Sequence, residues 1–333
     1  MSMRQTTAIR RSDPVRRTRT AEQAFQAMAA EVREGLSRRP LPELPCKYFY
    51  DERGSALFEA ITELPEYYQT RTESALLEAH AAAIVEATGP VELVELGSGA
   101  GHKIRLFLDA MRSRGSLESV VLLEISEGYL RDSVDRLQAD YPEAAVRGIV
   151  GDFTHDLSEL GPGGRRLLLF LAGTIGNLHP DDVPALFREA AAVLAPGDGF
   201  LVGVDLVKDE ARLHAAYNDA AGVTAEFNRN ILRVLNHRLR ADFDPDHFEH
   251  RAFYDAERQW IEMRLRARRP LTARVPAAGV TLTLEAGDEI RTELSCKYTQ
   301  ESLLARLAGT GFVLERFISD PGRLFASVLL RRT

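Results

Sequence analysis

Between residues 91 and 205, short apolar runs alternate with longer segments in which apolar residues recur every three or four positions. The runs predict buried strands, and the periodic segments predict amphipathic helices. Strands are predicted over residues 91–96, 120–124, 146–150, 167–171 and 199–205, with helices such as 103–111, 126–140 and 180–194 between them. This alternation is typical of a doubly wound α/β fold with a mostly parallel sheet.

The C-terminal segment departs from this alternation. After a helix predicted over 300–307, residues 311–317 and 324–330 form two strand patterns on either side of Pro321-Gly322. That dipeptide favours a turn, so we expect an antiparallel hairpin at the end of the sheet.

The rest of the chain does not extend the strand–helix alternation. Helices are predicted over 21–36 and 71–87, with an aromatic-rich segment over 48–70 between them. Two helices between 209 and 239 precede strands over 259–268 and 280–284. We expect residues 71–207 and 297–333 to form a cofactor-binding domain, and residues 22–70 and 208–296 to form a second, α+β substrate-binding domain.

Composition adds information mainly at the N-terminus. Six arginines lie within the first nineteen residues without an apolar run, so we expect residues 1–21 to form a disordered basic tail. The content of 45% hydrophobic and 27% charged residues is that of a soluble globular protein.

Charge and cysteine content limit the partners and the compartment. A net charge of −7 argues against a nucleic-acid partner. No apolar run reaches 18 residues, which argues against a membrane span. Two cysteines, Cys46 and Cys296, give no disulfide framework, so we expect a cytoplasmic protein, and we expect it to be a monomer.

Three successive strand ends carry groups that suit adenosine. The first predicted strand runs into Gly97-Ser98-Gly99, where residues without Cβ atoms allow a tight turn and close approach to a ligand. The second strand ends at Glu124, whose carboxylate can accept hydrogen bonds from ribose hydroxyls. The third strand is followed by Asp152 and Phe153, an acid for the adenine amine and a ring for stacking.

NAD and S-adenosylmethionine (SAM) both contain adenosine. His102 stands where a dinucleotide-binding fingerprint would have its third glycine, which counts against NAD. The Asp152-Phe153 pair and the C-terminal hairpin are similar to those of class I SAM-dependent methyltransferases, which have a Rossmann-like fold. We therefore expect SAM as the cofactor and S-adenosyl-L-homocysteine as its product.

A metal site is the alternative for His247-Phe248-Glu249-His250. Asp244, Pro245 and Asp246 precede this segment and indicate a loop, and no cysteine or third histidine lies at ligand spacing. We expect no metal.

Six sequence motifs occur in order over about 250 residues. They are Tyr48–Ser55, Leu64–Tyr68, Gly173–Leu178, Val204–Asp209, Phe227–Asn230 and Ile290–Glu293. Together they resemble the histidine-specific Nα-methyltransferases of ergothioneine biosynthesis, and the resemblance covers nearly the whole chain after the first twenty or so residues. That family converts L-histidine into its trimethylammonium betaine, hercynine.

The resemblance implies a set of site residues. Cofactor contacts are implied for Tyr67, Gly97, Lys103, Glu124, Asp152 and Phe153, beside Gly99 of the glycine turn. For histidine, it implies Asn177 near the α-amine, Tyr67 and Tyr217 on the carboxylate, Glu293 and Ser295 on the imidazole, and Met263 beside the ring. Two positions differ from the family: Glu124 replaces the more usual aspartate, and Ala172 replaces a glycine.

The α-amine must lose a proton before each methyl transfer. Tyr50 is a candidate to accept or relay that proton, and a bound water could do the same. Two rivals to histidine methylation remain open. The same enzyme fold could act on another amino acid, such as tryptophan or tyrosine, or the chain could be a non-catalytic SAM-binding sensor.

Overall fold

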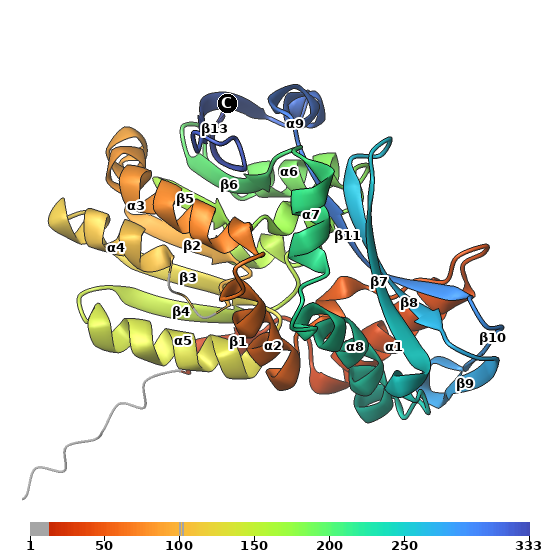
Figure 1. The fold of residues 1–333 in the computed structure, drawn as a ribbon. Helices are drawn as coiled ribbons and strands as arrows, with labels where there is room; N and C mark the ends of the chain where they lie inside the picture. The colour runs from red at the N-terminus through yellow and green to blue at the C-terminus, as the bar shows by residue number, and fades with distance from the viewer. Residues whose placement is uncertain (1–12, 100, 102) are drawn as a thin grey trace, which may run out of the picture.

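The computed structural model describes residues 13–99, 101 and 103–333. Its larger half is built on an eight-stranded sheet with the order β1-β4-β3-β2-β5-β6-β13-β12 (Figure 1). The strands are β1 (Val15–Arg17), β2 (Glu92–Leu96), β3 (Ser119–Glu124), β4 (Ala145–Val150), β5 (Arg166–Phe170), β6 (Gly199–Asp205), β12 (Phe312–Ser319) and β13 (Phe325–Arg332).

The first six strands of this order run parallel, and the last two are antiparallel to their neighbours. Central strands such as β3 and β6 are buried along almost their whole length because helices cover both faces of the sheet, which explains their continuous apolar sequences. The predicted C-terminal hairpin is confirmed.

Helices pack on both faces of the large sheet (Figure 1). One hydrophobic cluster joins the sheet to α3, α4 and α5, and a second joins its other face to α6 and α9. These helices are α3 (Tyr68–Thr88), α4 (Ile104–Ser113), α5 (Glu127–Asp140), α6 (Val183–Ala192) and α9 (Gln300–Leu307).

Strand β1 corrects the prediction of a disordered tail over residues 1–21. Residues 1–12 lie outside the described residues, but Val15 to Arg17 pair in parallel with β4 at the edge of the sheet. The Val15 side chain is 5% exposed and belongs to the α3–α5 cluster. Arg17 forms an ion pair with Glu127 at 2.7 Å. One buried valine and the backbone pairing order a segment whose charge alone suggested disorder.

The smaller half is built from four helices and two small sheets that share one hydrophobic cluster. The helices are α1 (Ala21–Ser37), α2 (Glu52–Thr62), α7 (Glu210–Tyr217) and α8 (Val223–Leu239). A three-stranded sheet has the order β11-β8-β7, and β9 pairs with β10. These strands are β7 (Phe248–Asp255), β8 (Trp260–Ala267), β9 (Leu271–Val275), β10 (Val280–Leu284) and β11 (Glu289–Cys296).

The chain passes between the halves beside Asp205, at the end of β6. Tyr68 at the start of α3 places its Oη 2.9 Å from an Asp205 oxygen, and Lys208 and Lys297 form ion pairs with the same carboxylate at 2.5 and 2.9 Å. The chain also crosses between the halves at the link from β1 to α1, at the opposite edge of the sheet. In the described part of the chain, no helix is long and apolar enough to cross a membrane.

Candidate active site

A cavity of about 820 Å³ lies between the carboxyl ends of the parallel strands and the smaller half. A cavity here follows from the fold, because loops after parallel strands meet at one edge of the sheet. Of the predicted site residues, all but Asp152 line it: Tyr50, Tyr67, Gly97, Gly99, Lys103, Glu124, Phe153, Asn177, Tyr217, Met263, Glu293 and Ser295.

The glycine turn after β2 has the expected backbone. Gly97 and Gly99 have φ values of +67° and +48°, in the left-handed region that favours glycine. Glu124 binds this turn: one of its oxygens accepts the Gly99 N–H at 3.1 Å, and the other accepts the Ser126 N–H at 3.0 Å. Burial raises the pKa of Glu124 despite these bonds. Glu124 therefore shapes the turn as well as facing the cavity.

Lys103 has a protein partner that the sequence did not reveal. Its ammonium forms an ion pair with Glu73 of α3, whose side chain is fully buried. The Glu73 carboxylate also accepts the Ala172 N–H at 2.9 and 3.0 Å. Gly203 makes room for it, since a Cβ at that position would lie 2.2 Å from a Glu73 oxygen. This arrangement fixes Lys103 at the cavity wall.

Phe153 and Asp152 separate after β4. The Phe153 ring lines the cavity and meets Phe170 edge-on, with 5.0 Å between ring centroids. Asp152 lines an adjoining hollow, where it forms a 2.7 Å ion pair with Lys47. Although burial opposes the charge, this contact holds the pKa of Asp152 below its usual value. Lys47 lines both hollows, so Asp152 lies at their shared boundary.

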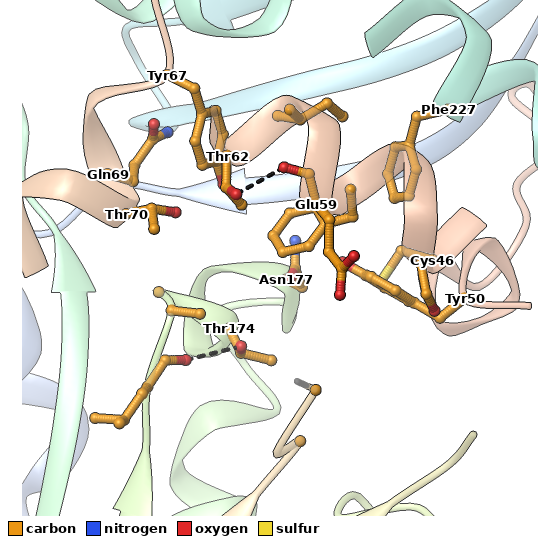
Figure 2. Close-up of a pocket in the computed structure, with 18 of the residues that line it drawn as sticks. Cys46, Tyr50, Glu59, Thr62, Tyr67, Gln69, Thr70, Thr174, Asn177 and Phe227 are labelled. Atoms are coloured by element: carbon orange, nitrogen blue, oxygen red, sulfur yellow. Dashed lines mark hydrogen bonds between the residues drawn. The ribbon is translucent and has the colours of Figure 1, made fainter. Parts of the chain in front are cut away.

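Aromatic rings form the wall contributed by the smaller half (Figure 2). Tyr50 meets Phe227 and Phe58 edge-on at 5.6 and 5.7 Å, and Phe58 meets Tyr67 at 6.2 Å. Burial raises the pKa of Tyr50 well above its usual value. A hydroxyl that keeps its proton at neutral pH is a poor proton acceptor, although it can still relay a proton.

Glu293 and Asn177 meet at the β11 side of the cavity. The Asn177 amide donates to the Leu294 carbonyl at 2.9 Å, and it lies close enough to Glu293 to favour the ionised carboxylate. Burial raises the pKa of Glu293 to about 7, although Lys297 and Asn177 oppose the shift. Met263 lies opposite Glu293 in the register of β8 and β11, and its side chain is 1% exposed.

Ser295 and Tyr217 form a linked pair of hydroxyls. Tyr217 Oη donates to Ser295 Oγ at 2.7 Å. Lys297 donates to both hydroxyls, at 2.7 Å to Ser295 and 3.0 Å to Tyr217. Burial opposes the charge on Lys297, yet its contacts with Asp205 and Tyr217 raise its pKa.

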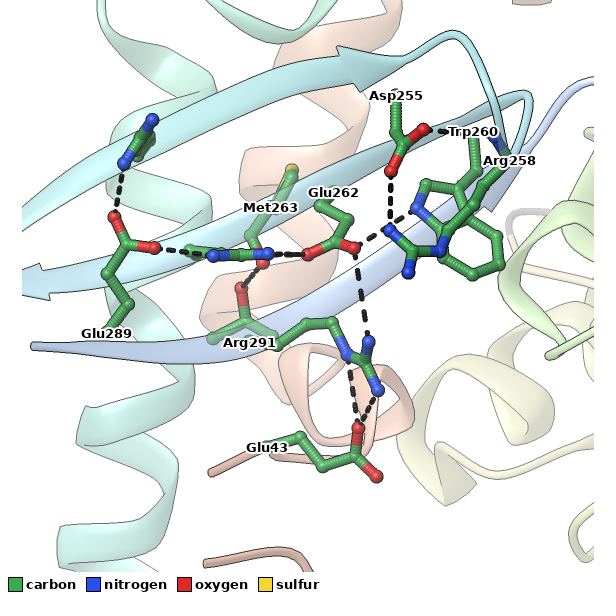
Figure 3. Close-up of polar contacts among 11 residues, drawn as sticks. Glu43, Asp255, Arg258, Trp260, Glu262, Met263, Glu289 and Arg291 are labelled. Carbon is green, nitrogen blue, oxygen red and sulfur yellow. Dashed lines mark hydrogen bonds and ion pairs between the residues drawn. The ribbon is translucent and has the colours of Figure 1, made fainter. Parts of the chain in front are cut away.

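The strands that carry Met263 and Glu293 are braced by ion pairs (Figure 3). Arg264 links Glu262 and Glu289, at 2.5 and 2.7 Å. The Trp260 indole N–H donates to Glu262 at 3.1 Å, and Arg291 pairs with Glu43 ahead of α2. On β8 the network lies on the face opposite Met263, because neighbouring residues of a strand face opposite sides. On β11 the register shifts between Arg291 and Glu293, so that Arg291 pairs with Arg264 while Glu293 pairs with Met263. The network therefore holds both strands without occupying the cavity.

The histidines near residue 250 have structural partners. His250 lies on β7, and its ring nitrogens lie 2.8 Å from Asn228 Nδ2 and 2.9 Å from the Tyr217 carbonyl. Over residues 13–99, 101 and 103–333, no cluster of three or more His, Cys, Asp or Glu side chains is placed to hold a metal.

The cavity also contains buried polar groups that sequence reasoning missed. Gln69 and Glu95 line it, at 5% and 4% exposure, and atoms of both lack hydrogen-bond partners among the described residues. The hydroxyl oxygen of Ser98 is also buried without a hydrogen-bond partner among these residues. Such groups fit a ligand that carries charged and hydrogen-bonding ends. Among the site residues that sequence reasoning missed, Lys297 could have been found from the sequence. It lies two residues after Ser295 and four after Glu293, so strand alternation places it on the same face.

Comparisons with known proteins agree with this geometry. The family model described as "Histidine-specific methyltransferase, SAM-dependent" matches residues 28–332. Histidine N-alpha-methyltransferase of Mycolicibacterium smegmatis is 45% identical over 94% of this chain and 97% of that protein. The protein of the same name from Mycobacterium tuberculosis is 44% identical over 88% of this chain and 91% of its own. Ergothioneine biosynthesis protein 1 of Neurospora crassa is 29% identical over 78% of this chain and 30% of that protein.

The solved structure of a SAM-dependent methyltransferase from Clostridium acetobutylicum superposes with a TM-score of 0.49 at 10% sequence identity. The match covers 83% of this chain and 97% of that protein's chain. The family assignment comes from the match over residues 28–332 and from the two mycobacterial relatives. On that evidence, this chain belongs to the SAM-dependent, histidine-specific methyltransferase family.

Proposed function

We propose that this enzyme transfers three methyl groups from SAM to the α-nitrogen of L-histidine, giving hercynine for ergothioneine biosynthesis. One observation carries the proposal: the adenosine-type groups Gly97, Glu124 and Phe153 share a single cavity with Glu293 and Ser295, a polar pair suited to an imidazole. A ring with two nitrogens can bond both groups, whereas an apolar ring would leave them unpaired.

The chain's part in the reaction is mainly to position the reactants. SAM supplies an electrophilic methyl group on its sulfonium. The cofactor would be held by the glycine turn, Glu124 and Lys103, and the histidine α-amine by Asn177. Fixing the nucleophile in line with the methyl group can contribute roughly 7–11 kcal/mol of the barrier.

The aromatic wall suits the later methylation steps. Each transfer makes the α-nitrogen more bulky and less able to donate hydrogen bonds, until it is a quaternary ammonium. Tyr50, Tyr67 and Tyr217 line the cavity and can hold such a cation by cation–π attraction, worth about 0.5–2 kcal/mol. A bound water is our choice for removing the α-ammonium proton.

Product masses test the substrate. The enzyme should be incubated with SAM and each of the twenty amino acids, and histidine should gain three methyl groups, all on the α-nitrogen. Methylation of a ring nitrogen, or preference for tryptophan or tyrosine, would refute the proposal. SAM binding without turnover of any amino acid would indicate a sensor instead.

Calorimetry tests the cofactor separately. SAM and S-adenosyl-L-homocysteine should bind to the purified protein, and NAD should not. We also propose a cytoplasmic location, supported by the free thiols of Cys46 and Cys296, and a monomer in solution. Sedimentation should give the mass of one chain.

A further inference from the structure

The Lys297 ammonium lies directly behind two hydroxyls of the cavity wall. Its three N–H groups have three protein acceptors: Ser295 Oγ at 2.7 Å, Tyr217 Oη at 3.0 Å and an Asp205 oxygen at 2.9 Å. Its side chain has no exposed surface, so water does not compete for these bonds. Lys297 therefore has no N–H left to offer a substrate.

Ser295 receives two of the hydrogen bonds in this cluster. Lys297 and Tyr217 both donate to its oxygen, each at 2.7 Å. A hydroxyl oxygen has two acceptor lone pairs and one O–H donor. Both lone pairs are thus engaged, and only the O–H remains. Ser295 can donate a hydrogen bond to a ligand, but it cannot accept one.

Glu293, two residues earlier on β11, has the opposite character, because an ionised carboxylate only accepts. A neutral imidazole has one N–H and one bare nitrogen, which match Glu293 and Ser295 respectively. A protonated imidazole has two N–H groups and would turn one of them toward Ser295, where no lone pair is free.

We propose that Lys297 is a positioning residue that makes the site select neutral histidine, in the tautomer whose N–H faces Glu293 and whose bare nitrogen faces Ser295. The inference rests on the proposed function, since it assumes that the imidazole occupies this end of the cavity. Lys297 acts through Ser295 and Tyr217, whose hydroxyls it polarises and orients.

Other titratable groups near this end come from several elements. Asp205 and Lys208 lie behind Lys297, and Tyr50, Tyr67 and Cys46 lie on the opposite walls. Burial raises the pKa values of the last three, so they stay neutral below pH 8. Glu293, near 7, and Lys208, lowered by burial to about 8, titrate closer to neutrality. Lys208 does not line the cavity, so its ionisation affects all substrates alike. Glu293 bonds the ring directly, and it presents an acceptor oxygen to the ring N–H whether its carboxyl is ionised or neutral.

The direct test is ¹⁵N NMR of ring-labelled histidine bound to the enzyme with S-adenosyl-L-homocysteine. At pH 6, where a free imidazole is mostly protonated because its pKa is about 6.5, the bound ring should show one protonated and one bare nitrogen. Two protonated nitrogens, or an average over both tautomers, would overturn the proposal. This measurement uses the unaltered enzyme.

A kinetic test isolates Lys297. Histidine is compared with 1,2,4-triazolylalanine, whose ring stays neutral at these pH values, and the ratio of their kcat/KM values removes ionisations of enzyme groups that do not bond the ring. From pH 5.5 to 7.5 the ratio should rise about tenfold, following the neutral fraction of an imidazole with a pKa of about 6.5. In Lys297→Met, Ser295 regains a lone pair, and the rise should shrink to less than about threefold.

Lys208→Met is the matched control, because it removes the other lysine bound to Asp205 but leaves the hydroxyl pair untouched; it should keep the tenfold rise. A Lys297→Met ratio that follows the parental curve would refute the role of Lys297. If that variant does not fold, the NMR result decides alone. Intact SAM binding without histidine turnover would instead count against the proposed function.

Discussion

The Ala172 backbone has a φ of +62°, in the left-handed region that residues with a Cβ rarely adopt. That conformation costs roughly 1–2 kcal/mol, and glycine's extra chain entropy offsets about 0.5–1 kcal/mol of any gain. We therefore expect Ala172→Gly to stabilise the protein by up to about 1.5 kcal/mol in denaturant unfolding. Because Ala172 lines the cavity, the KM for histidine should change as well.

Arg240→Gly provides a matched control. Arg240 has a φ of +56° and is exposed at the end of α8. It should give a similar gain in stability with unchanged kinetics. Loss of stability in Ala172→Gly would show that glycine's extra chain entropy and the lost methyl contacts, rather than relief of strain, dominate at this turn.

Glu293 should select the imidazole. Glu293→Ala would leave the ring N–H unpaired, a cost of about 1–3 kcal/mol, so kcat/KM for histidine should fall at least tenfold. SAM affinity by calorimetry should hardly change, and apolar aromatic amino acids should lose little. Glu293→Gln keeps an acceptor oxygen and should lose less. Histidine turnover at the parental rate in Glu293→Ala would make the acid a bystander.

At the level of elements, β1 is a three-residue strand held by one buried side chain. Val15 Cγ2 lies close to Gly148 of β4, where a Cβ would approach it to 3.1 Å. Val15→Ala should cost about 1–2 kcal/mol of unfolding free energy. It should also speed hydrogen exchange of the Gly148 N–H, which donates to the Pro14 carbonyl at 2.9 Å.

Arg16→Ala is the control on the same strand. Its side chain is 52% exposed, so its ion pair should contribute no more than about 0.5 kcal/mol. Equal effects of the two substitutions would mean that surface charge, not the buried valine, holds β1 in place.

The sequence predicted best those elements whose environment is uniform. Strands such as β3 are buried on both faces and read as unbroken apolar runs, and α9 agrees with its prediction at both ends. Strand β11 was missed because Glu289 and Arg291 interrupt its pattern, and these charges are satisfied by Arg264 and Glu43 from other segments.

The same limit applies to the site. The resemblance placed Glu293 and Ser295 together on the imidazole, although no strand was predicted there and the register shifts between Arg291 and Glu293. The partners of Lys103 and Lys297, namely Glu73 and Asp205, come from distant parts of the chain. No local pattern encodes such pairs, because only the tertiary fold brings them into contact.

For the molecule as a whole, buried acids should set the pH dependence of stability. Burial raises the pKa of Glu95 from 4.5 to about 8, so the folded state holds this proton more tightly than the unfolded state. Its contribution is fully present below pH 4.5 and is lost as pH rises through 8. Between these pH values, the free energy of unfolding of the parental protein should fall by roughly 2–4 kcal/mol relative to that of Glu95→Gln.

Urea unfolding at a series of pH values measures this difference. Glu118→Gln, at an exposed position, should run parallel to the parental protein. Parallel curves for the parental protein and Glu95→Gln would show that folding does not raise the pKa of Glu95.

Strand β1 also changes how the two halves can separate. Without it, the connections beside Asp205 would act as a hinge at one end of the cavity, and the other end could swing open. The link from β1 to α1 lies five strands away from β6 across the sheet. It connects the two halves at the other end of the cavity and restricts their separation there. The two halves are therefore connected on both sides of the cavity, and the three residues of β1 form the second connection.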